Sequence, residues 1–423
     1  MKHFIIKGPT KGVKGNINIS GAKNSCLPLM AASILFEKKV VFKNIPLVND
    51  VYTMKNLLIA LGSKVVINKS NKMMTIINTR PHKLVVPYEL VSTMRAGVLT
   101  MGSLLGRYHK KNIYVAKGGG CSLGIRDINY HLSGFESLGA SNSLQKGYVK
   151  ISSKDKLKGS LFKFPKVTVT GSANLIMASV FIKGFHIIKN ISIEPEVIDL
   201  INFLNNSGAN IKFLGKRTIK ITGVKELIKG NHNIIGDRIE AFSYLCVAAI
   251  TGGCVTVKNI NPKHLKTELS ILKKIGYKIK TSDNSVYLKS IKKLNSVKIK
   301  TAPFPGLATD SMPMLLALLT KVPGKSEILE NIFSNRFMAA PELSRMGAKI
   351  KVKRNKAVIL GTRNLFGADC ISSDLRTTFS IILGALSATG TSKIQRIYHG
   401  LRGYSNLEKN LKKMGVKIKS VEK

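Results

Sequence analysis

A short turn built on glycine recurs six times along the 423 residues of the chain. Each copy follows an apolar stretch and precedes a β-branched one, as in Met346-Gly347-Ala348-Lys349-Ile350. The glycines lie 68 to 77 residues apart, at Gly62, Gly139, Gly208, Gly276, Gly347 and Gly415. Such self-similarity indicates one structural unit copied along the chain. The longest interval also contains Lys117-Gly118-Gly119-Gly120-Cys121, an inserted loop that carries a thiol.

Each predicted unit combines strands and helices in the same order. It begins with an alternating β-branched stretch, such as residues 255–260, which is typical of a strand with one buried face. An amphipathic helix follows, as at residues 54–61, and the glycine ends it where a left-handed backbone is required. A second strand comes next, as at residues 348–352.

A more apolar helix is also expected in every unit, for example at residues 173–180 and 313–319. Because these helices are hydrophobic all round, they should be buried. The pattern predicts an α/β protein of six βαβαββ-type units, three per domain, with helices inside and sheets outside. This is an inside-out α/β barrel in two domains and not a doubly wound sheet. We expect residues 22–235 to form one domain, and residues 1–21 with 236–423 to form the other.

Composition limits the classes of protein that fit. No apolar run reaches the ~18 residues of a membrane helix, and residues 1–7 lead to no small-residue cleavage site, so we expect a cytoplasmic protein. The five cysteines are widely spaced and odd in number, which favours free thiols and argues against a structural zinc site. Four of them, all except Cys121, lie in apolar or small-residue contexts and are expected to be buried.

The net charge of +46 raises the question of a polyanionic partner. The lysines are dispersed along the chain and form no basic tail or patch, which favours solvated faces over a nucleic-acid site. Known cofactor fingerprints also fail. Residues 118–124 do not give G-x-G-x-x-G, and Pro323-Gly324-Lys325-Ser326 lacks the first glycine of a phosphate loop because residue 319 is leucine. Histidines are few and unclustered, so we expect neither a metal nor an organic cofactor.

Seven short motifs remain, and their order along the chain is informative. They are Ser20-Gly21-Ala22-Lys23-Asn24-Ser25, Thr93-Met94-Arg95-Ala96, residues 120–126 (GCSLGIR), residues 301–310 (TAPFPGLATD), Asn335-Arg336-Phe337-Met338, Ser373-Asp374-Leu375-Arg376 and His399-Gly400-Leu401-Arg402-Gly403-Tyr404. With these motifs the chain resembles the UDP-N-acetylglucosamine 1-carboxyvinyltransferase family of enolpyruvyl transferases, from residue 1 to about residue 418. The Gly-Gly-Cys loop and the Asn-Arg-Phe-Met segment favour this family over the related 3-phosphoshikimate 1-carboxyvinyltransferases.

The resemblance implies a reaction and its substrates. The family transfers the enolpyruvyl group of phosphoenolpyruvate to the 3-hydroxyl of UDP-N-acetylglucosamine and releases phosphate, which opens peptidoglycan precursor synthesis for the cell wall. Both substrates would bind in the cleft between the two domains. Three alternatives stay open: the shikimate-pathway activity, a basic nucleic-acid-binding protein that reuses the fold, and an inactive homologue.

For phosphoenolpyruvate, the resemblance implies a set of cationic and polar side chains. Arginine suits this task because its planar fork binds oxyanions at two points. Lys23, Arg126 and Arg402 would hold the phosphate, Arg336 and Arg376 the carboxylate, and Asn24 would lie beside the substrate.

Acid–base roles also follow from the resemblance. The loop thiol of Cys121 would be the acid, would capture phosphoenolpyruvate covalently and would be the target of fosfomycin. Nearby cations should lower its pKa, and a glycine-rich loop can close over substrate. Asp310 would be the base for the 3-hydroxyl, although a helix N-cap is an alternative reading. Asp374 would orient Arg376 or share in proton handling, with the structural pair favoured.

The nucleotide sugar would contact a further group of residues. These are Asn24, Arg95 and Asp310 at the sugar, Arg126, Asp127, Ile128, Asn129 and Tyr130 at the uridine, Lys166, Val167, Thr168 and Val169 at the diphosphate, and Ile332 at the sugar wall. Backbone amides of the 167–169 turn could donate to phosphate. Glu194 and His131 would line the cleft, with a structural role as the alternative for His131 and strand core as the alternative for Ile332. The chain departs from the family at Asp127, Tyr130, Phe304, Ser334 and Leu401.

Overall fold

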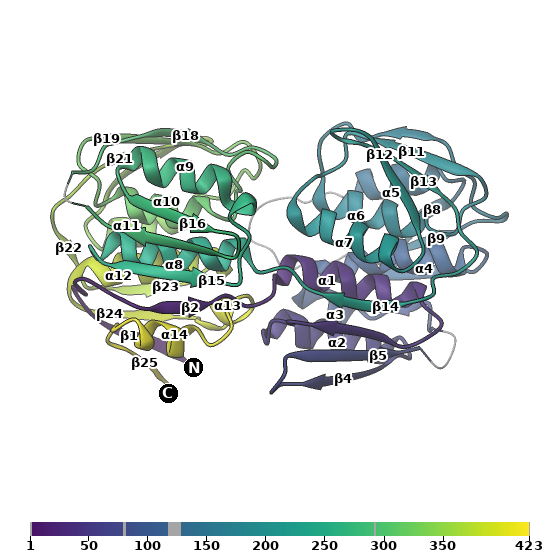
Figure 1. Ribbon diagram of the computed structural model, residues 1–423, viewed down its shortest axis with the longest axis horizontal. Helices are drawn as coiled ribbons and strands as arrows, with labels where there is room; N and C mark the ends of the chain where they lie inside the picture. The colour runs from purple at the N-terminus through teal and green to yellow at the C-terminus, as the bar shows by residue number, and fades with distance from the viewer. Residues whose placement is uncertain (1, 79–81, 117–127, 292, 423) are drawn as a thin grey trace. The chain divides into compact units, whose positions relative to one another are not determined.

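The computed structural model describes residues 2–78, 82–116, 128–291 and 293–422 (Figure 1). Cys121, Arg126 and Asp127 lie outside the described residues. The chain divides into two compact units. Unit 1 contains residues 2–20 and 236–422, and unit 2 contains the described part of residues 21–235.

Unit 2 contains three four-stranded sheets that share one pairing pattern. In each, the first pair of strands is parallel and the other two pairs are antiparallel. The strand orders, with bounds, are β14 (Gly230–Asn233), β3 (Val40–Lys43), β5 (Met73–Ile77), β4 (Lys64–Asn68); then β6 (Val85–Val86), β7 (Ile113–Ala116), β9 (Tyr148–Ser152), β8 (Ser141–Gln145); then β10 (Leu161–Lys163), β11 (Phe185–Lys189), β13 (Thr218–Thr222), β12 (Asn210–Gly215).

Unit 1 repeats this arrangement with strands from both ends of the chain. Two sheets run β2 (Asn16–Asn18), β15 (Cys254–Lys258), β17 (Ser285–Lys289), β16 (Lys278–Ser282), and β18 (Lys298–Lys300), β19 (Lys325–Leu329), β21 (Lys356–Leu360), β20 (Lys349–Lys353). The third runs β22 (Leu365–Phe366), β24 (Ala388–Gln395), β1 (His3–Gly8), β25 (Ile418–Val421), and β23 (Asp369–Ile371) also pairs with β24. The N-terminal β1 therefore completes the sheet that the C-terminal residues begin.

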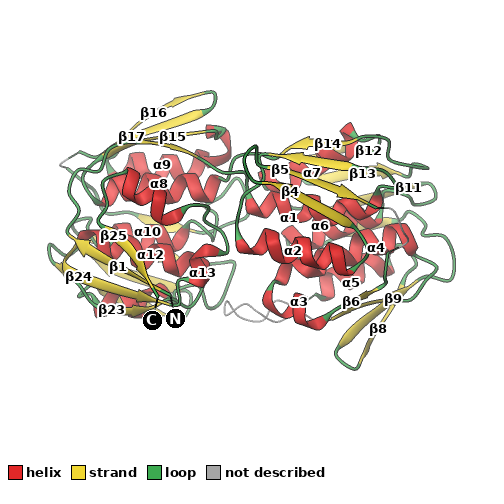
Figure 2. Ribbon diagram, turned by 90° about the horizontal axis from the view of Figure 1, so that it is seen from below, coloured by secondary structure: helices red, strands yellow, loops and turns green. Residues whose placement is uncertain are grey.

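The helices of each unit form an inner and an outer set. The inner helices are α1 (Lys23–Ala32), α4 (Thr100–Tyr108) and α6 (Val169–Ala178) in unit 2, and α8 (Arg238–Ile250), α10 (Met312–Leu319) and α12 (Leu375–Ser387) in unit 1. Every residue of α8 and α10 is buried. Figure 2 shows the helices of each unit lying between its sheets. The predicted α/β class with sheets outside is confirmed, although α6 ends before Ser179 and Val180.

The outer helices end at the repeated glycines. They are α2 (Asn49–Ala60), α5 (Asn129–Glu136), α7 (Pro195–Asn206), α9 (Lys266–Ile275), α11 (Ala339–Arg345) and α14 (Leu407–Lys413). All six glycines have positive φ, from 89° at Gly139 and Gly415 to 125° at Gly276. An L side chain is strained in this conformation, so the predicted role of glycine as helix terminator is confirmed.

Shorter helical segments complete the description. They are α3 (Tyr88–Thr93), α13 (Tyr398–Leu401) and the 3-10 turns η1 (Ser33–Leu35), η2 (Arg95–Leu99) and η3 (Pro262–Leu265). Within the described part of the chain, no helix is both long enough and apolar enough to span a membrane.

The described cysteines are all free thiols, and they correct one expectation. Cys26, Cys246 and Cys370 are buried as predicted, but Cys254 at the start of β15 is only half-buried. Burial raises the pKa of the Cys26 and Cys246 thiols well above the usual value and that of Cys370 to about 12. Deprotonation to the reactive thiolate is therefore disfavoured at these three positions.

Candidate functional site

Asp310 lies between two buried arginines of unit 1. Arg336 donates from Nη2 to Oδ1 of Asp310 at 2.7 Å, and Arg376 donates from Nε and Nη2 to Oδ2 at 3.2 and 3.1 Å. The arginine side chains are 1% and 3% exposed, whereas that of Asp310 is 27% exposed. Buried guanidinium groups need such partners because an unpaired buried charge is strongly destabilising. The three residues come from separate motifs and form one ionic cluster.

The segment that carries Asp310 is fixed by two buried carboxylates. Glu268 of α9 accepts hydrogen bonds from Ala308 N at 3.3 Å and from Ser311 Oγ at 3.1 Å. Glu330, directly after β19, accepts one from Thr309 Oγ1 at 3.1 Å. Burial raises the pKa of Glu268, and the nearby Arg238 opposes that shift. Hydrogen bonds on both sides of Asp310 therefore hold its backbone in place.

Asn331, which follows β19, is hydrogen-bonded to Thr301 at the start of the segment that carries Asp310. Asn331 donates from its backbone N to Thr301 Oγ1 at 2.9 Å and from Nδ2 to Thr301 O at 3.3 Å. Its counterpart Asn259, which follows β15, donates to Ile19 O at 2.8 Å. The repeated strand–asparagine pattern therefore fixes the point where the segment leaves β18.

Asp310 does not cap a helix, which corrects the alternative reading. The residue at the N-cap of α10 is Ser311, and no side-chain hydrogen bond caps this helix. The capping carboxylate of the site is Asp374, at the N-terminus of α12. Its Oδ1 accepts from Arg376 N at 2.8 Å and Thr377 N at 3.1 Å, and lies 4.0 Å from Arg336 Nη1. Asp374 therefore fixes the backbone of Arg376 and is not bonded to its guanidinium group by any described contact.

Arg376 also rests on an aromatic surface. Its Cζ lies 5.4 Å from the centroid of the Tyr404 ring, and that ring lies 4.7 Å from the ring of Phe379. The Tyr404 hydroxyl is 2.8 Å from Ser243 Oγ of α8. Burial raises the pKa of Tyr404, and the neighbouring Arg376 opposes this shift. A cation stacked on a buried ring is restricted in orientation, so Tyr404 helps to position the guanidinium group.

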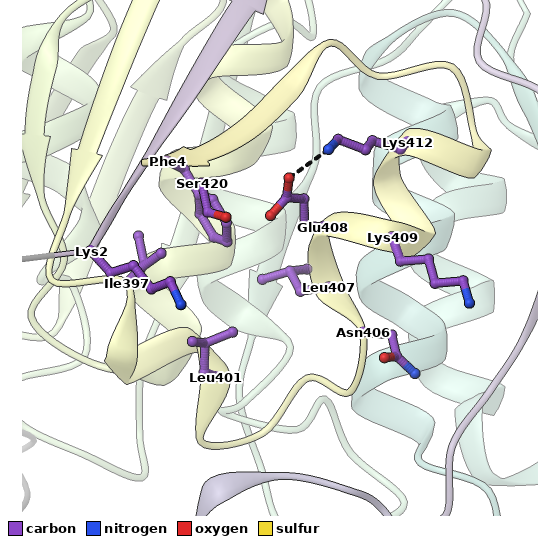
Figure 3. A pocket seen from close by; sticks show the side chains of 10 residues that line it. All are labelled: Lys2, Phe4, Ile397, Leu401, Asn406, Leu407, Glu408, Lys409, Lys412 and Ser420. Atoms are coloured by element: carbon purple, nitrogen blue, oxygen red, sulfur yellow. Dashed lines mark ion pairs between the residues drawn. The ribbon is translucent and has the colours of Figure 1, made fainter. Parts of the chain in front are cut away.

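Arg402 is the C-cap residue that follows α13, and it is partly exposed. Its neighbour Leu401 lines a hollow of about 520 Å³ together with Lys2, Phe4 and Glu408 (Figure 3). Glu408 pairs there with Lys412 at 2.6 Å. Asp310, Arg336 and Arg376 do not line this hollow, so it is separate from the ionic cluster.

In unit 2, the motif residues begin at the N-terminus of α1. Lys23 is the first residue of this helix, and its Nζ lies 3.1 Å from Oδ2 of Asp50 in α2. Both side chains are largely buried, at 13% and 6% exposed. Asn24 follows in α1 and is half-buried, and Arg95 begins η2. The ion pair holds the Lys23 ammonium group at the end of a buried helix.

His131 of α5 belongs to a buried hydrogen-bond network. Asn174 of α6 donates from Nδ2 to Nδ1 of His131 at 2.7 Å and to Val98 O at 2.9 Å. Since Nδ1 accepts, Nε2 carries the proton and faces Thr170 Oγ1 at 3.2 Å. Asn174 Oδ1 accepts from Gly102 N at 2.9 Å. The network ties α4, α5 and α6 together, which favours the structural reading of this histidine.

The other expected nucleotide-sugar residues of unit 2 lie at two helix N-termini. Ile128 is buried next to α5, and Asn129 and Tyr130 are its first two residues. Lys166 and Val167 precede α6, Thr168 is its N-cap, with Oγ1 accepting from Gly171 N at 3.2 Å, and Val169 is its first residue. A helix N-terminus favours anions, because the first backbone N–H groups of a helix have no partner within it.

Two further expected residues have clear environments. Glu194 is the N-cap residue of α7 and accepts a hydrogen bond from Ser192 Oγ. Ile332 is 38% exposed and follows β19 without being part of it, so the strand-core reading is wrong. Glu330 Oε1 accepts from Ile332 N at 2.8 Å, which fixes the backbone at this apolar side chain.

Several residues of the site were not singled out from the sequence. Asp50, Glu268 and Glu330 each contact a motif residue or its segment, and Tyr404, although part of the seventh motif, was given no role of its own. Acidic side chains are rare in this chain, with 22 Asp and Glu against 68 Lys and Arg, which was a usable signal for the first three. Among the described residues, no group of three or more His, Cys, Asp or Glu could hold a metal ion.

Comparison with known proteins decides the family. A family model described as EPSP synthase (3-phosphoshikimate 1-carboxyvinyltransferase) matches residues 7–420. The chain belongs to this family of enolpyruvyl transferases. A family member from Pelagibacter ubique, named UDP-N-acetylglucosamine 1-carboxyvinyltransferase, is 44% identical over 421 residues and covers 100% of both chains. One of the same name from Koribacter versatilis is 41% identical, covering 100% of this chain and 97% of its own.

Solved structures agree with this family fold. The enolpyruvyl transferase NikO from Streptomyces tendae has a TM-score of 0.90 at 20% identity, covering 99% of each chain. EPSP synthase from Acinetobacter baumannii has a TM-score of 0.78 at 18% identity over 100% of each chain. At such identities the likeness shows the fold alone. The family resemblance drawn from the seven motifs is confirmed by the sequence comparisons.

Proposed function

We propose that this enolpyruvyl transferase moves the enolpyruvyl group of phosphoenolpyruvate to the 3-hydroxyl of UDP-N-acetylglucosamine and releases phosphate. The observation that carries the proposal is 40–44% identity, over essentially the whole chain, to relatives that bear the name of this activity. The buried arginine pair of unit 1 supports it because two guanidinium groups on one carboxylate suit a carboxylate substrate.

In the proposed reaction, Arg336 and Arg376 bind the carboxylate of phosphoenolpyruvate, and Lys23, Arg126 and Arg402 bind its phosphate. Asp310 takes the proton of the 3-hydroxyl of the sugar while the hydroxyl oxygen forms a bond to C2 of phosphoenolpyruvate. Cys121 delivers a proton to C3 of phosphoenolpyruvate. Loss of a proton from C3 and departure of phosphate from C2 then give the enolpyruvyl product. Such proton transfers need groups within hydrogen-bond reach of the reacting atoms.

The nucleotide sugar has its own proposed contacts. We expect Asn24 and Arg95 to bind the sugar, residues 126–130 to bind the uridine, and residues 166–169 at the N-terminus of α6 to bind the diphosphate. The exposed side chain of Ile332, which lies past the end of β19, supports an apolar contact with the sugar. Tyr130 is partly buried against the core of unit 2, which leaves part of its ring for the uracil.

Phosphate release from phosphoenolpyruvate tests the proposal. The reaction is run alone, with UDP-N-acetylglucosamine, and with shikimate-3-phosphate. We expect release only with UDP-N-acetylglucosamine, none in Cys121→Ala, and activity that escapes fosfomycin in Cys121→Asp, whose carboxyl can still carry a proton. Release with shikimate-3-phosphate alone would refute the proposal and assign the second family activity instead.

A further inference from the structure

The solvent side of one sheet in unit 1 carries an unusual number of lysines. The sheet is formed by β18, β19, β21 and β20 (Figure 1). Ile299, Ile328 and Ile359 pack against the core of the unit, so the residues on either side of each one point to solvent. The outward lysines, called the lysine face below, are all exposed: Lys298, Lys300, Lys325, Lys349, Lys351, Lys353 and Lys356.

Strand pairing brings these lysines together, although they are spread over residues 298–356 of the sequence. Lys325 and Lys349 lie on either side of Leu360, and Lys298 lies opposite Glu327. Neighbouring strands are about 4.8 Å apart, and side chains on one face recur about every 7 Å along a strand. The attachment points of all seven lysines therefore fall within an area about 15 Å on each side.

Glu327 is the single acidic side chain among the strand residues of this face. Its carboxylate lies 3.4 Å from Lys325 Nζ and 3.0 Å from Lys356 Nζ. The hydrogen bond from Lys356 lowers the pKa of Glu327, and the charge of Lys298 acts in the same direction. One glutamate among seven lysines leaves the face strongly positive.

The other described sheets are less basic on their solvent side. The sheet formed by β2, β15, β17 and β16 in the same unit has four outward lysines in its strands, and no other described sheet has more than four. These four are Lys258, Lys278, Lys280 and Lys289. The positive charge of the chain is therefore concentrated on the lysine face.

The other side chains of the face favour an anionic bilayer over a nucleic acid. Among the strand residues of the face there is neither an arginine nor an aromatic side chain, and these are the residue types that read bases or stack on them. An area about 15 Å wide is also broader than the major groove of DNA, which is about 12 Å wide. Leu329, Val358 and Leu360 lie among the lysines, and Leu360 is 47% exposed. Cations with interspersed apolar groups suit the headgroup region of a bilayer.

We propose that the lysine face binds the surface of a membrane that contains anionic phospholipids. The lysine ammonium groups pair with lipid phosphates as point charges, and each lysine close to such a surface strengthens binding by about fivefold. The association is peripheral, since no helix in the described part of the chain could span a membrane. The inference goes beyond the proposed function, because none of the seven lysines is assigned to either substrate.

Vesicle sedimentation with the full chain at physiological ionic strength tests the proposal. The unmodified chain should bind vesicles of phosphatidylglycerol and phosphatidylcholine in equal parts, and should not bind vesicles of phosphatidylcholine alone. The test variant replaces four lysines of the face by glutamine: Lys298, Lys349, Lys351 and Lys353. The control variant makes the same change at four lysines of the neighbouring sheet: Lys258, Lys278, Lys280 and Lys289.

The two variants lose the same charge from different sheets. Binding should weaken at least about tenfold in the test variant and less than about threefold in the control, because exposed charges more than about 8 Å from the bilayer are screened. An equal loss in both variants would show that net charge alone drives binding and would overturn the proposal. Absence of binding by the unmodified chain would overturn it as well.

A gain of binding guards against an unfolded variant. Glu327→Gln removes the one acidic side chain of the face and should tighten binding to the anionic vesicles by about two- to fivefold, which loss of structure cannot mimic. Unchanged or weaker binding in this variant would contradict the proposal. Duplex DNA is the comparison ligand. If the unmodified chain prefers it to the vesicles at equal phosphate concentration, and only the test variant loses it, the face belongs to a nucleic acid instead.

Discussion

Low pH should destabilise unit 2 because it contains a buried histidine whose protonated, charged form is unfavourable in the folded chain. His186 in β11 is fully buried, and its Nδ1 accepts a hydrogen bond from Ser160 N at 3.0 Å. Among the described residues, its Nε2 has no hydrogen-bond partner. Burial lowers the pKa of His186 from 6.5 to about 4, because the charged ring would be poorly solvated. The substitution His186→Asn removes this titration and keeps an acceptor near Ser160.

The size of the effect follows from linkage. A group whose folded pKa is depressed contributes stability that is complete above its unfolded pKa and is lost as the pH falls toward the folded pKa. With values of 6.5 and about 4, the loss at pH 4.5 is roughly 2.5 kcal/mol, and at pH 7.5 it is close to zero. His82, whose pKa is also lowered to about 4 by burial and by Arg107, should add a similar loss in the same unit.

Urea unfolding at pH 7.5 and pH 4.5, followed by far-ultraviolet circular dichroism, measures this loss. The decrease in unfolding free energy between the two pH values should be smaller in His186→Asn than in the unmodified chain by about 2.5 kcal/mol. Ile188→Val, in the same strand, removes buried volume without a titrating group and should keep the full decrease. An identical decrease in His186→Asn and the unmodified chain would refute the argument.

Three further predictions concern other features. Asp374→Ala removes the cap of α12 and should cost about 1–2 kcal/mol of stability and raise KM for phosphoenolpyruvate; an unchanged KM would contradict its role in fixing Arg376. Gly276→Ala should lower the melting temperature more than Gly139→Ala, because a Cβ at Gly276 would lie 2.7 Å from Lys293 O whereas nothing lies within 4 Å at Gly139; equal losses would argue against this clash. In the native chain, iodoacetamide should label Cys254 but spare Cys26 and Cys246, as read by mass spectrometry; native labelling of Cys26 would conflict with its burial.

Local chemistry made much of the fold predictable. Each of the six glycines follows an amphipathic helix, and a left-handed residue at a helix end is a local requirement that few other residues meet. The alternation of β-branched residues likewise identified β15, because a half-buried strand imposes a period of two. The family resemblance came from the order of seven motifs and not from any single residue.

The environment of each motif residue could not be obtained in this way. Thr309-Asp310-Ser311 before an apolar helix has the composition of a cap, yet the two arginines draw the Asp310 carboxylate away from the helix. Ile332 continues a β-branched stretch but lies past the end of the strand and is exposed. In both cases a partner distant in sequence outweighs the local preference.

The sequence by itself determined the repeated unit, the helix ends, the family and the residue types suited to an anionic substrate, since these depend on short stretches and their order. Only the tertiary structure decided that Asp310 binds both arginines, that Lys23 pairs with Asp50, and that Glu268 and Glu330 fix the segment between them. These contacts join residues 21 to 66 positions apart, and buried charges must find partners wherever the fold brings them together.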